Sequence, residues 1–575
     1  MNNVAIAEVM ESIAQLLELK GESSFKVRAY RRAAQAIENL PAEVERLMRE
    51  GRLREIPGVG DSISQKIIEL LGSGKCEYYE NLRAEFPSGI TRLMEIPGIG
   101  PKTASRLAKD LSIATVEDLE QAVLDGRVAK LPRMGEKLAE NILHHLRSLR
   151  RKDQRIPLGQ ALPVADAIVE QLKDNPALRN LTPAGSLRRR METIGDIDII
   201  GTSDAPKAVM DQFTGLAQVK EVLVKGPTKT SVVVEGGVQV DLRLVEHDAF
   251  GSLLQHFTGS KQHNIDLREL ALKKGLSLSE YGITRLLDGQ LQKFTEEEAF
   301  YAALGLEFIP PELREASGEI EAAGRQAIPR LVEQGDIRGD LHTHTDWSDG
   351  RSSLREMVEA ARDLGYEYVA VTDHSVGRGV ARGLSVERLL RQREEIQELD
   401  RSVKGITVLQ GAEVDIRADG TLDFPDEVLA GLDVVTASVH SSMGQDEETM
   451  TNRILKVIQN PHVDIIGHLT CRLLGHRPPV ALNIEKVLRA AAETKTALEI
   501  NSQPERLDLK DVHIRQARDL GVMMVINTDA HWVHQLGAMR FGVAIARRGW
   551  CEPRHILNTR TLPEVLAYLR ERSLS

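Results

Sequence analysis

The chain has 575 residues, 28% of them charged and 42% hydrophobic, with a formal net charge of −11. At roughly 150 residues per domain, this length predicts about four domains, and the absence of a long polar tract or biased repeat excludes an intrinsically disordered protein. No apolar stretch reaches the roughly 20 residues of a membrane span, and the N-terminal segment lacks the basic start and apolar run of a signal peptide, so we expect no membrane association and a cytoplasmic location.

The cysteines and the basic residues narrow the possible chemistry. Cys76, Cys471 and Cys551 are too few and too far apart for a disulfide framework or a cysteine zinc cluster, so any transition-metal site must use histidine and carboxylate. The negative net charge argues weakly against a general polyanion binder, but nucleic-acid binding depends on local charge. Basic side chains form three local groups: Lys26, Arg28, Arg31 and Arg32; Arg147, Arg150, Arg151 and Lys152; and Arg188, Arg189 and Arg190.

Residues 1–150 have the pattern of short helices joined by turns, and one turn motif is repeated. Residues 56–60 and 96–100 both read Ile-Pro-Gly-x-Gly, and each is followed by a helical pattern that carries Lys66 or Lys102. Such a turn exposes backbone N–H groups at the N-terminus of the second helix, and these donors suit a phosphate. One copy alone would only mark where one helix ends and the next begins. Two copies indicate helix-hairpin-helix motifs that bind the DNA backbone, at Gly58, Gly60, Gly98 and Gly100.

Residues 155–250 change to β-branched runs, at 197–201, 231–235 and 238–245, with helices between them. Asp196 and Asp198 alternate along the first run, so both carboxylates point to one face, and Asp241 lies in the third run. Three converging carboxylates repel each other unless cations lie between them, and two divalent ions about 4 Å apart would clamp a phosphoryl transfer. Gly185, Ser186 and Arg189 lie upstream, where they would contact a triphosphate. The alternative is a surface pair of aspartates at a strand end.

The chain from about residue 335 onward alternates strands with helices, which predicts a parallel β/α barrel-like domain. An Ala/Glu-rich segment over 316–334, with one proline, is interpreted as a helical connector before it. Polar residues follow most of the predicted strands, at the rim where such barrels place their chemistry. Strands are expected at 368–372, 407–410, 434–438, 463–466, 497–500 and 523–527.

The barrel-like half carries a recurring set of metal-ligand types. His342 and His344 lie on one side of an extended segment, so both can bind one ion. The same residue types then recur after successive strands, which scattered structural histidines would explain poorly. The full set exceeds the need of one ion and predicts two or three ions, with Mn, Zn or Fe suited to ligands that lack cysteine. The candidate ligands are His342, His344, Asp349, His374, Glu413, His440, His468, Asp529 and His531.

The segment from the N-terminus to about residue 315 resembles the family X DNA polymerases. The Gly-Ser-x-Arg-Arg and Gly-Asp-x-Asp motifs with Asp241 match that family's palm. The resemblance implies Mg²⁺ or Mn²⁺ at Asp196, Asp198 and Asp241, and DNA contacts from Lys26 and Tyr30. Lys66 matches the family's Schiff-base lysine, although a plain phosphate contact fits that position equally. The implied nucleotide contacts are Gly185, Ser186, Arg189, Gly195, His256, Phe257, Gly259, Asn264 and Arg268.

Three positions depart from the family pattern. His256 replaces a tyrosine, which puts discrimination against ribonucleotides in doubt; Gln239 stands where many members carry arginine, and Ile194 replaces a serine. Residues 336–575 resemble the polymerase and histidinol phosphatase (PHP) family, whose ligand set is complete here. Arg378, Arg382, Arg472 and Arg477 are either phosphate contacts or solvated loop residues.

The combination of both halves resembles bacterial family X polymerases with a C-terminal PHP domain. It implies gap-filling synthesis in base excision repair, together with a 3′–5′ exonuclease, 3′-phosphatase or abasic-site endonuclease activity. The implied substrates are gapped or primed duplex DNA and deoxynucleoside triphosphates, and the protein is expected to be a monomer. The alternatives are a DNA 3′-end hydrolase with a vestigial polymerase half, and a small-molecule phosphatase.

The expected fold is multidomain α/β. It comprises a helical lyase-like domain with a helix-hairpin-helix at 1–80, a fingers-like helical domain at 81–155, a nucleotidyltransferase palm with a mixed sheet at 156–250, a thumb at 251–315, a linker at 316–335 and a distorted β/α barrel of the PHP type at 336–575.

Overall fold

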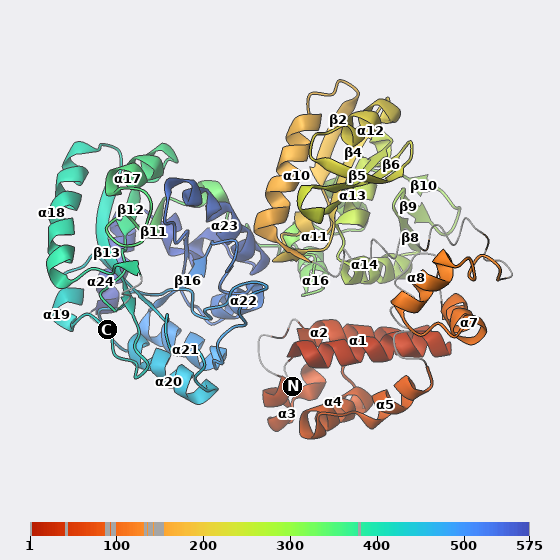
Figure 1. Cartoon of the computed structure of the whole chain (residues 1–575), viewed down its shortest axis with the longest axis horizontal. Helices are drawn as coiled ribbons and strands as arrows, with labels where there is room; N and C mark the ends of the chain where they lie inside the picture. The colour runs from red at the N-terminus through yellow and green to blue at the C-terminus, as the bar shows by residue number, and fades with distance from the viewer. Residues whose placement is uncertain are drawn as a thin grey trace. The chain divides into compact units, whose positions relative to one another are not determined.

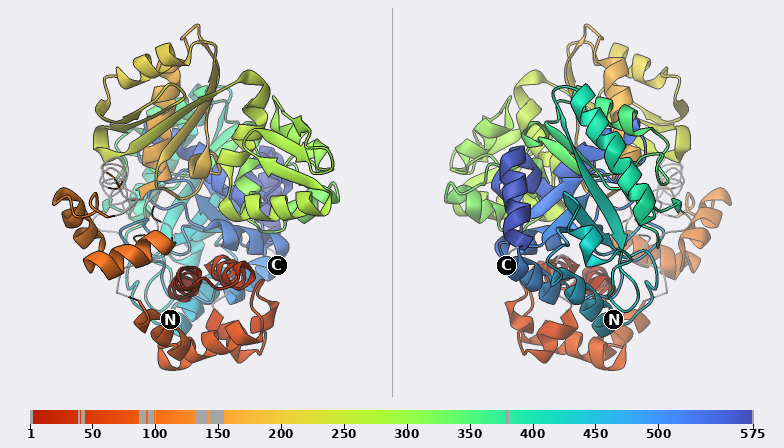
Figure 2. Two further views of the ribbon diagram at one scale, coloured as in Figure 1. Left: turned by 90° about the vertical axis from the view of Figure 1, so that its right-hand side faces the viewer. Right: turned by 90° about the vertical axis from the view of Figure 1, so that its left-hand side faces the viewer.

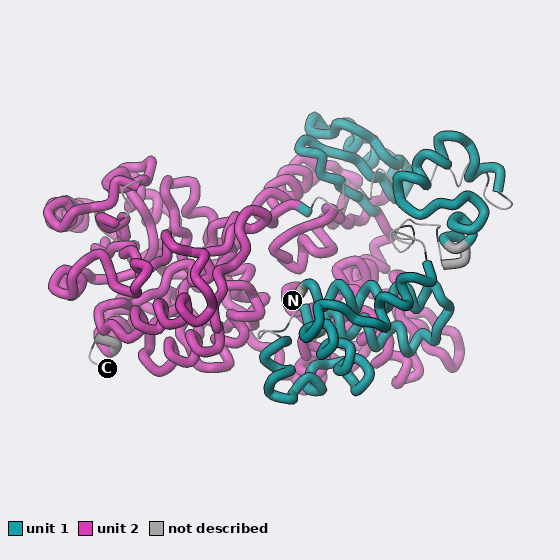
Figure 3. The backbone as a smooth tube through the Cα atoms, turned by 60° about the horizontal axis from the view of Figure 1, so that its bottom comes forward, with its two compact units in different colours: residues 1–155, 205–243 teal, residues 156–204, 244–575 magenta. Residues whose placement is uncertain are grey.

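A computed structural model describes residues 3–38, 40, 44–86, 93, 99, 101–131, 135, 142, 155–377 and 381–573. Contacts divide the chain into two compact units, one formed by residues 1–155 and 205–243 and the other by 156–204 and 244–575 (Figure 3). None of the helices within the described ranges is both long enough and apolar enough to cross a membrane.

The N-terminal region is helical, as the sequence predicts (Figure 1). In the first helix Ile6, Met10, Ile13 and Leu17 are fully buried, and their spacing of three and four residues puts one apolar stripe against the neighbouring helices. The helix after the second glycine motif begins at Pro101, close to the predicted start. The elements are α1 (Asn3–Lys20), α2 (Ser24–Glu38), α3 (Val44–Arg49), the 3-10 helix η1 (Leu53–Glu55), α4 (Asp61–Ser73), α5 (Glu77–Ala84), α7 (Pro101–Leu111) and α8 (Val116–Leu124).

The middle of the chain forms a five-stranded sheet in the order β2-β4-β7-β6-β5. The three predicted β-branched runs are confirmed as the strands β4, β6 and β7. Their β-branched side chains, such as Ile199, Val232 and Val240, are buried. The elements are β1 (Ile156–Pro157), α10 (Leu158–Leu172), β2 (Leu178–Pro183), α11 (Gly185–Arg188), β3 (Thr193–Ile194), β4 (Ile197–Ser203), α12 (Pro206–Thr214), β5 (Val219–Lys225), β6 (Lys229–Val234), η2 (Glu235–Gly237) and β7 (Gln239–Val245).

The next segment combines helices with a small antiparallel sheet, in the order β10-β9-β8, around a core that includes Phe300, Tyr301 and Ile309. The helical connector expected over 316–334 is wrong in extent. Only α16 is helical there, and it ends at Gly324, before Gln326 at φ 54° and the helix-breaking Pro329. The elements are η3 (His247–Ala249), α13 (Phe250–Thr258), α14 (Lys261–Lys273), β8 (Leu276–Ser279), β9 (Gly282–Arg285), β10 (Leu291–Gln292), α15 (Glu297–Ala303), η4 (Pro311–Leu313), α16 (Glu319–Gly324) and η5 (Gln334–Asp336).

The C-terminal part is a parallel sheet of seven strands, β11 to β17 in sequence order. A bridge between Thr343 and Ala530, with the hydrogen bond from His344 N to Ala530 O at 2.8 Å, joins the last strand to the first and closes the barrel. The predicted β/α barrel is therefore confirmed, and helices lie outside its strands (Figure 2, right). The strands are β11 (Gly339–Thr343), β12 (Tyr368–Val371), β13 (Thr407–Asp415), β14 (Val434–Ser438), β15 (Ile465–Ile466), β16 (Ala497–Asn501) and β17 (Met524–Asn527).

The strands of the barrel are buried from end to end, which explains their continuous apolar runs. In β12, for example, all four residues of Tyr-Val-Ala-Val are buried, as expected where helices cover a parallel sheet. The surrounding helices are α17 (Leu354–Asp363), α18 (Val386–Ser402), α19 (Asp426–Leu429), α20 (Glu447–Ile458), α21 (Ile484–Thr494), α22 (Asp511–Asp519), η7 (Val533–Ala538), α23 (Met539–Arg548), η8 (Pro553–His555), η9 (Leu557–Thr559) and α24 (Leu562–Ser573).

A buried arginine ties the segment after the palm together and gives a test of the fold. Arg314 is fully buried; its guanidinium donates to Glu297 Oε1 at 2.6 Å and to Ile309 O at 2.9 Å. Removing one partner of a buried pair leaves the other charge poorly compensated, at a cost of about 3 kcal/mol. We therefore expect Arg314→Met to lower the free energy of urea unfolding by about that amount, with faster hydrogen exchange in α13 and α15.

The matched control is Arg285→Met, because Arg285 is exposed and pairs with Asp288 at 3.0 Å on the surface. That change should cost less than about 1 kcal/mol. Equal stability of both variants would show that the buried pair does not hold this segment together.

Candidate active sites

The C-terminal ends of the barrel strands bring the predicted metal ligands together. His342 lies in β11 and Glu413 in β13, so both are fixed by sheet hydrogen bonds. The other candidates stand in the short segments that follow strands, at the rim where β/α barrels carry their chemistry. These are His344 and Asp349 after β11, His374 after β12, His440 after β14, His468 after β15, and Asp529 and His531 after β17.

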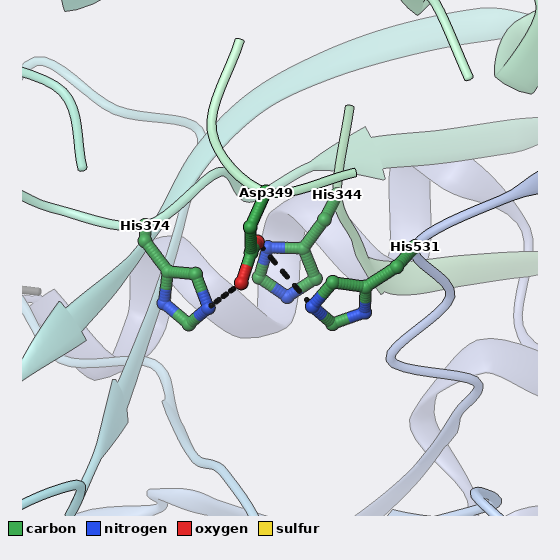
Figure 4. A group of neighbouring side chains, drawn as sticks. All are labelled: His344, Asp349, His374 and His531. Atoms are coloured by element: carbon green, nitrogen blue, oxygen red, sulfur yellow. Dashed lines mark ion pairs between the residues drawn. The ribbon is translucent and has the colours of Figure 1, made fainter. Parts of the chain in front are cut away.

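The ligand atoms form three overlapping groups, each with all its atoms within 4.8 Å of one another. Figure 4 shows the first group, in which the Asp349 carboxylate lies between the rings of His374 and His531, at 3.6 and 3.4 Å. His344 and His374 each belong to two groups, so neighbouring ions would share ligands. The groups are His344, Asp349, His374 and His531; His342, His344 and Asp529; and His374, Glu413 and His440.

Glu413 lies at the centre of these groups. Its Oε2 is 2.9 Å from His374 Nδ1, and its Oε1 is 3.0 Å from His468 Nε2 and 3.2 Å from His440 Nε2. His342 and His344 lie at 3.6 and 3.5 Å from Oε2. His468 belongs to none of the three compact groups among the described residues, and its link to them is through Glu413.

The state of the buried imidazoles fits metal ligands. Within the described ranges, His342 Nε2, both ring nitrogens of His344 and His374 Nδ1 are buried without a hydrogen-bond partner, although carboxylate oxygens face them. A buried polar atom without a partner costs free energy, so this arrangement is expected where an ion takes the place of the hydrogen bond. The residues present therefore fit divalent ions, and their role as ligands stays a prediction.

The charges of the cluster are strongly coupled. Burial raises the pKa of Glu413, but His374 and His440 outweigh it and hold the pKa well below its usual range. Burial lowers the pKa of His342, but Glu499, Glu413 and Asp529 outweigh it and raise the pKa well above its usual range. Burial, with His531 and His374 nearby, lowers the pKa of His344 to about 3, so this imidazole is neutral and able to bind a cation at neutral pH.

Two carboxylates behind the cluster, Glu499 and Asp415, were not found from the sequence. Glu499 Oε1 accepts from His342 Nδ1 at 2.6 Å, and Asp415 Oδ1 accepts from His440 Nδ1 at 2.5 Å. A carboxylate on one ring nitrogen fixes the tautomer and turns the other nitrogen toward the metal. Their positions in the sequence could have revealed them. Glu499 lies in a predicted strand, and Asp415 lies two residues after Glu413, on the same strand face.

The arginines considered as phosphate contacts are mostly engaged elsewhere. Arg472 is buried, and its guanidinium donates to Glu192 Oε1 at 2.6 Å and to the carbonyl of Arg506 at 2.9 Å. Arg477 Nε donates to Cys471 O at 2.7 Å. Arg382 is exposed, and Arg378 lies outside the described residues.

The first two palm carboxylates lie where a loop enters β4. Asp198 is in β4 and Asp196 immediately precedes it, after Gly195. Gly185 has φ 57°, and a Cβ placed on it would come within 2.7 Å of Asp198 Oδ2. Glycine at this position therefore permits the backbone turn into α11, which also carries Ser186, and leaves space for the carboxylate.

The third palm carboxylate, Asp241, lies in β7 and is only 6% exposed. Gln239 Nε2 donates to its Oδ1 at 2.8 Å, and Lys229 Nζ lies 3.4 Å from its Oδ2. Gln239, one of the departures from the family pattern, thus contacts the predicted metal ligand directly. Lys229 supplies positive charge beside it, as expected for a buried carboxylate.

Arg189 is fixed within the protein. Its Nε donates to Glu315 Oε1 at 2.9 Å and its Nη1 to Thr258 O at 2.6 Å. Arg548 of α23 donates both to Glu315 Oε1 at 3.1 Å and to Arg189 O at 2.8 Å. These bonds use Nε and Nη1 of Arg189 and position the loop, and the contact of Arg189 with a triphosphate stays a prediction.

The other predicted nucleotide contacts lie on two consecutive helices. His256 and Phe257 are on α13, with ring centroids 5.2 Å apart, and Gly259 follows the helix. Asn264 on α14 donates from Nδ2 to His256 O at 2.8 Å, which fixes the amide beside the helix end. Arg268 is exposed on α14.

The first glycine motif is a tight hairpin between η1 and α4. Gly58 has φ 85°, and a Cβ placed on it would lie 2.8 Å from Ala33 N, so only glycine fits there. Gly60 is the N-cap of α4, and no side chain of the described residues caps the N–H groups of the first turn. Gly98 and Gly100 lie outside the described residues.

Lys66 on α4 lies in a small cluster with residues of α2 and α5. Its Nζ donates to Ser62 Oγ at 2.9 Å and lies 4.5 Å from the centre of the Tyr78 ring. Tyr30 is buried and stacked on Tyr78, and Lys26 lies on the same ring. Partial burial, with a contribution from Lys26, lowers the pKa of Lys66.

Comparisons with known proteins agree with this geometry. Family models match four stretches of the chain: "Helix-hairpin-helix domain" at residues 1–76, "SAM-like Helix-hairpin-helix tandem" at 90–148, "DNA polymerase beta thumb" at 253–315 and "PHP domain" at 340–503.

Curated relatives match either the whole chain or its barrel. The DNA polymerase/3'-5' exonuclease PolX of Bacillus subtilis is 41% identical over 572 residues, which cover 99% of this chain and 100% of the relative. Probable phosphatases of Thermoanaerobacter and Shewanella halifaxensis are each 30% identical and match 40% of the chain, covering 94% and 92% of the relatives. The full-length match confirms the resemblance seen in the sequence: the chain belongs to the bacterial family X DNA polymerases that carry a PHP domain.

Proposed function

We propose that the chain is a DNA polymerase and 3′–5′ exonuclease that fills short gaps in duplex DNA during repair. The observation that carries the proposal is the intact ligand cluster around Glu413 in a chain that is 41% identical, over 99% of its length, to a relative named for both activities. Helix-hairpin-helix regions supply contacts to the DNA backbone, and deoxynucleoside triphosphates are the second substrate. Action on DNA as a monomer in the cytoplasm is part of the proposal.

In the polymerase site, Asp196, Asp198 and Asp241 would hold two Mg²⁺ or Mn²⁺ ions. When bound, such ions steady the charge on the attacking and leaving oxygens of a phosphoryl transfer. The primer 3′ oxygen bonds to the α-phosphorus, and the bond from that phosphorus to the pyrophosphate oxygen breaks. Gly185 and Ser186 would bind the phosphates through backbone and hydroxyl donors, and Gln239 holds Asp241 in place.

In the hydrolytic site, two or three ions of Mn, Zn or Fe would lie among the ligands around Glu413. When bound, such ions lower the pKa of water and stabilise charge on the phosphoryl oxygens. A water oxygen bonds to phosphorus, the bond from phosphorus to the 3′ oxygen breaks, and the strand ends in a 3′-hydroxyl. Glu499 and Asp415 hold His342 and His440 in the tautomers that face the ions.

A hydrolase with an inactive polymerase half is the second candidate. The observation in its favour is the match of the barrel to probable phosphatases over 40% of the chain. The three palm carboxylates and the glycine beside Asp198 argue against it, because an inactive site would not need to keep them.

Loss of each ligand set should abolish one activity and spare the other. On a labelled one-nucleotide gap with deoxynucleoside triphosphates, we expect Asp196→Ala to lose extension by about 1,000-fold and keep 3′ trimming, and His342→Ala to do the reverse. Mg²⁺ and Mn²⁺ are supplied in separate reactions. If wild type extends no better than Asp196→Ala while His342→Ala abolishes trimming, the polymerase half is inactive and the second candidate holds. Faster turnover of histidinol phosphate than of 3′-recessed DNA would instead favour a small-molecule phosphatase.

The carboxylate behind His342 should govern metal affinity. Glu499→Gln keeps the size of the side chain but removes the charge that holds the His342 N–H, and such changes typically weaken metal binding about 10- to 100-fold. Calorimetric titration of metal-free protein with Mn²⁺ measures this directly. Glu505→Gln is the control, since Glu505 lies in the loop after the same strand and is exposed. Unchanged Mn²⁺ affinity in Glu499→Gln would contradict the positioning role.

Lys66 is proposed as a Schiff-base lysine for the aldehyde of an abasic deoxyribose phosphate. Its lowered pKa, which follows from partial burial and from Lys26 nearby, supports a nucleophilic amine. Borohydride should trap wild type covalently on 5′-labelled abasic DNA, whereas Lys66→Ala should be trapped at least about tenfold less. Lys75→Ala, an exposed lysine after the same helix, should be trapped like wild type. Equal trapping in Lys66→Ala would leave Lys66 as a phosphate contact only.

A further inference from the structure

The loop between β16 and α22 approaches the metal cluster and is held firmly in place. Gln503 Nε2 donates to the carbonyls of Thr528 and Asp529, at 2.7 and 2.9 Å. Further along the loop, Asp508 is fully buried and accepts from Thr470 N at 2.9 Å and Thr470 Oγ1 at 2.8 Å. Both ends of the loop are thus bound to segments that carry candidate ligands, Asp529 on one side and His468 on the other.

Arg506 lies at the middle of this loop. Its backbone makes hydrogen bonds within the protein, but its guanidinium makes none among the described residues. Its N–H donates to Gln503 O at 2.8 Å, and its carbonyl accepts from Arg472 Nε at 2.9 Å. Within residues 155–377 and 381–573, the guanidinium makes no hydrogen bond, and its one ion pair is a long one, with Nε 3.8 Å from Asp529 Oδ2.

The guanidinium of Arg506 stands at the edge of the cluster and still reaches solvent. The side chain is 19% exposed, whereas Asp529 beside it is 7% exposed. The Nε of Arg506 lies 3.8 Å from Asp529 Oδ2, so the guanidinium faces the side of the cluster formed by Asp529.

Neighbouring arginines of the barrel use their guanidinium donors for hydrogen bonds within the protein. Arg472 donates to the carbonyl of Arg506 and to Glu192, and Arg477 donates to the carbonyl of Cys471 in its own loop. Arg388 donates to the carbonyls of Trp347 and Arg382. An arginine carries five N–H donors in a planar fork that matches the oxygens of a phosphate. Arg506 keeps that fork available on a rigid loop, beside carboxylates that bound ions would neutralise.

We propose that Arg506 is a substrate-binding residue of the hydrolytic site, whose guanidinium donates two hydrogen bonds to non-bridging oxygens of the phosphoryl group held at the cluster. The inference deepens the proposed function and rests on it, because it names the group that grips the phosphate at that site. A fixed fork at one edge also orients phosphorus toward the ions, so that the attacking water and the leaving oxygen come into line.

Binding of the product, thymidine 5′-monophosphate, tests the proposal without turnover. Every protein is the full chain with Asp196→Ala, so that the polymerase carboxylates contribute no nucleotide site, and it is loaded with Mn²⁺. Loss of hydrogen bonds to a charged group predicts that Arg506→Ala weakens binding about 10- to 100-fold, with Arg506→Lys in between because lysine keeps the charge but not the fork.

The matched control is Arg518→Ala. Arg518 is also 19% exposed, lies on α22 and pairs with Asp519, away from the cluster, so its loss should leave nucleotide binding within about twofold. Mn²⁺ titration of metal-free Arg506→Ala should match its parent, because Arg506 is not a ligand. The KM for 3′-recessed DNA should rise in parallel with the dissociation constant of the nucleotide.

Two results would overturn the proposal. Nucleotide binding by Arg506→Ala equal to that of Arg518→Ala would show that the guanidinium does not grip phosphate. Loss of Mn²⁺ affinity in Arg506→Ala would show that the residue holds Asp529 instead. Failure of the proposed function is distinct: if the wild-type chain binds the nucleotide through Arg506 but does not trim DNA, the substrate class is wrong and the phosphate contact stands.

Discussion

The buried carboxylate of Glu413 is the constraint on which the hydrolytic half depends. Among the described residues, five imidazole rings lie within 3.6 Å of its two oxygens, from His342, His344, His374, His440 and His468. A charge with so little exposure to water must be compensated, and several buried ring nitrogens lack hydrogen bonds of their own. Divalent ions would satisfy both needs at once, and the barrel brings the predicted ligands together from several strands.

In the polymerase half, arginine hydrogen bonds fix the loop after α11. The loop after α11 is bound to the protein by Arg189, and Arg548 of the barrel helix α23 joins Glu315 and the Arg189 carbonyl to Asp511. Arg472 adds a second buried link, to Glu192, which lies shortly before Asp196. These contacts place the segment that carries Gly185 and Ser186 against the barrel. The PHP barrel therefore also supports the shape of the loop that carries the predicted nucleotide contacts.

The sequence predicted most of the fold and the candidate ligand set, for physical reasons. Apolar stripes at helical spacing in α1 and continuous apolar runs in strands such as β12 are direct consequences of burial. The histidines could be grouped because parallel strands end at one rim. The connector over 316–334 was wrong because composition favoured a helix that Gly324 and Pro329 end early.

Contacts that depend on the three-dimensional path could not be predicted. Nothing local to Arg189 shows that Glu315, more than a hundred residues later, occupies its guanidinium. Glu499 and Arg506 lie in or after a predicted strand, yet their roles come from His342 and Asp529 on other strands. Such pairings follow from the path of the whole chain, which no short motif records.

The metal content of the Glu413→Gln variant tests the central claim most directly. Glutamine keeps the size of the side chain but removes the charge that the five imidazoles and the ions share. The variant and its parent both carry Asp196→Ala and are loaded with Mn²⁺, freed of excess metal and measured by mass spectrometry. The protein with Glu413→Gln should hold at least one ion fewer per chain than its Asp196→Ala parent, because Glu413 belongs to one ligand group and faces histidines of the other two. An equal metal content in the two proteins would contradict the account, because Glu413 would then not be the shared ligand at the centre of the cluster.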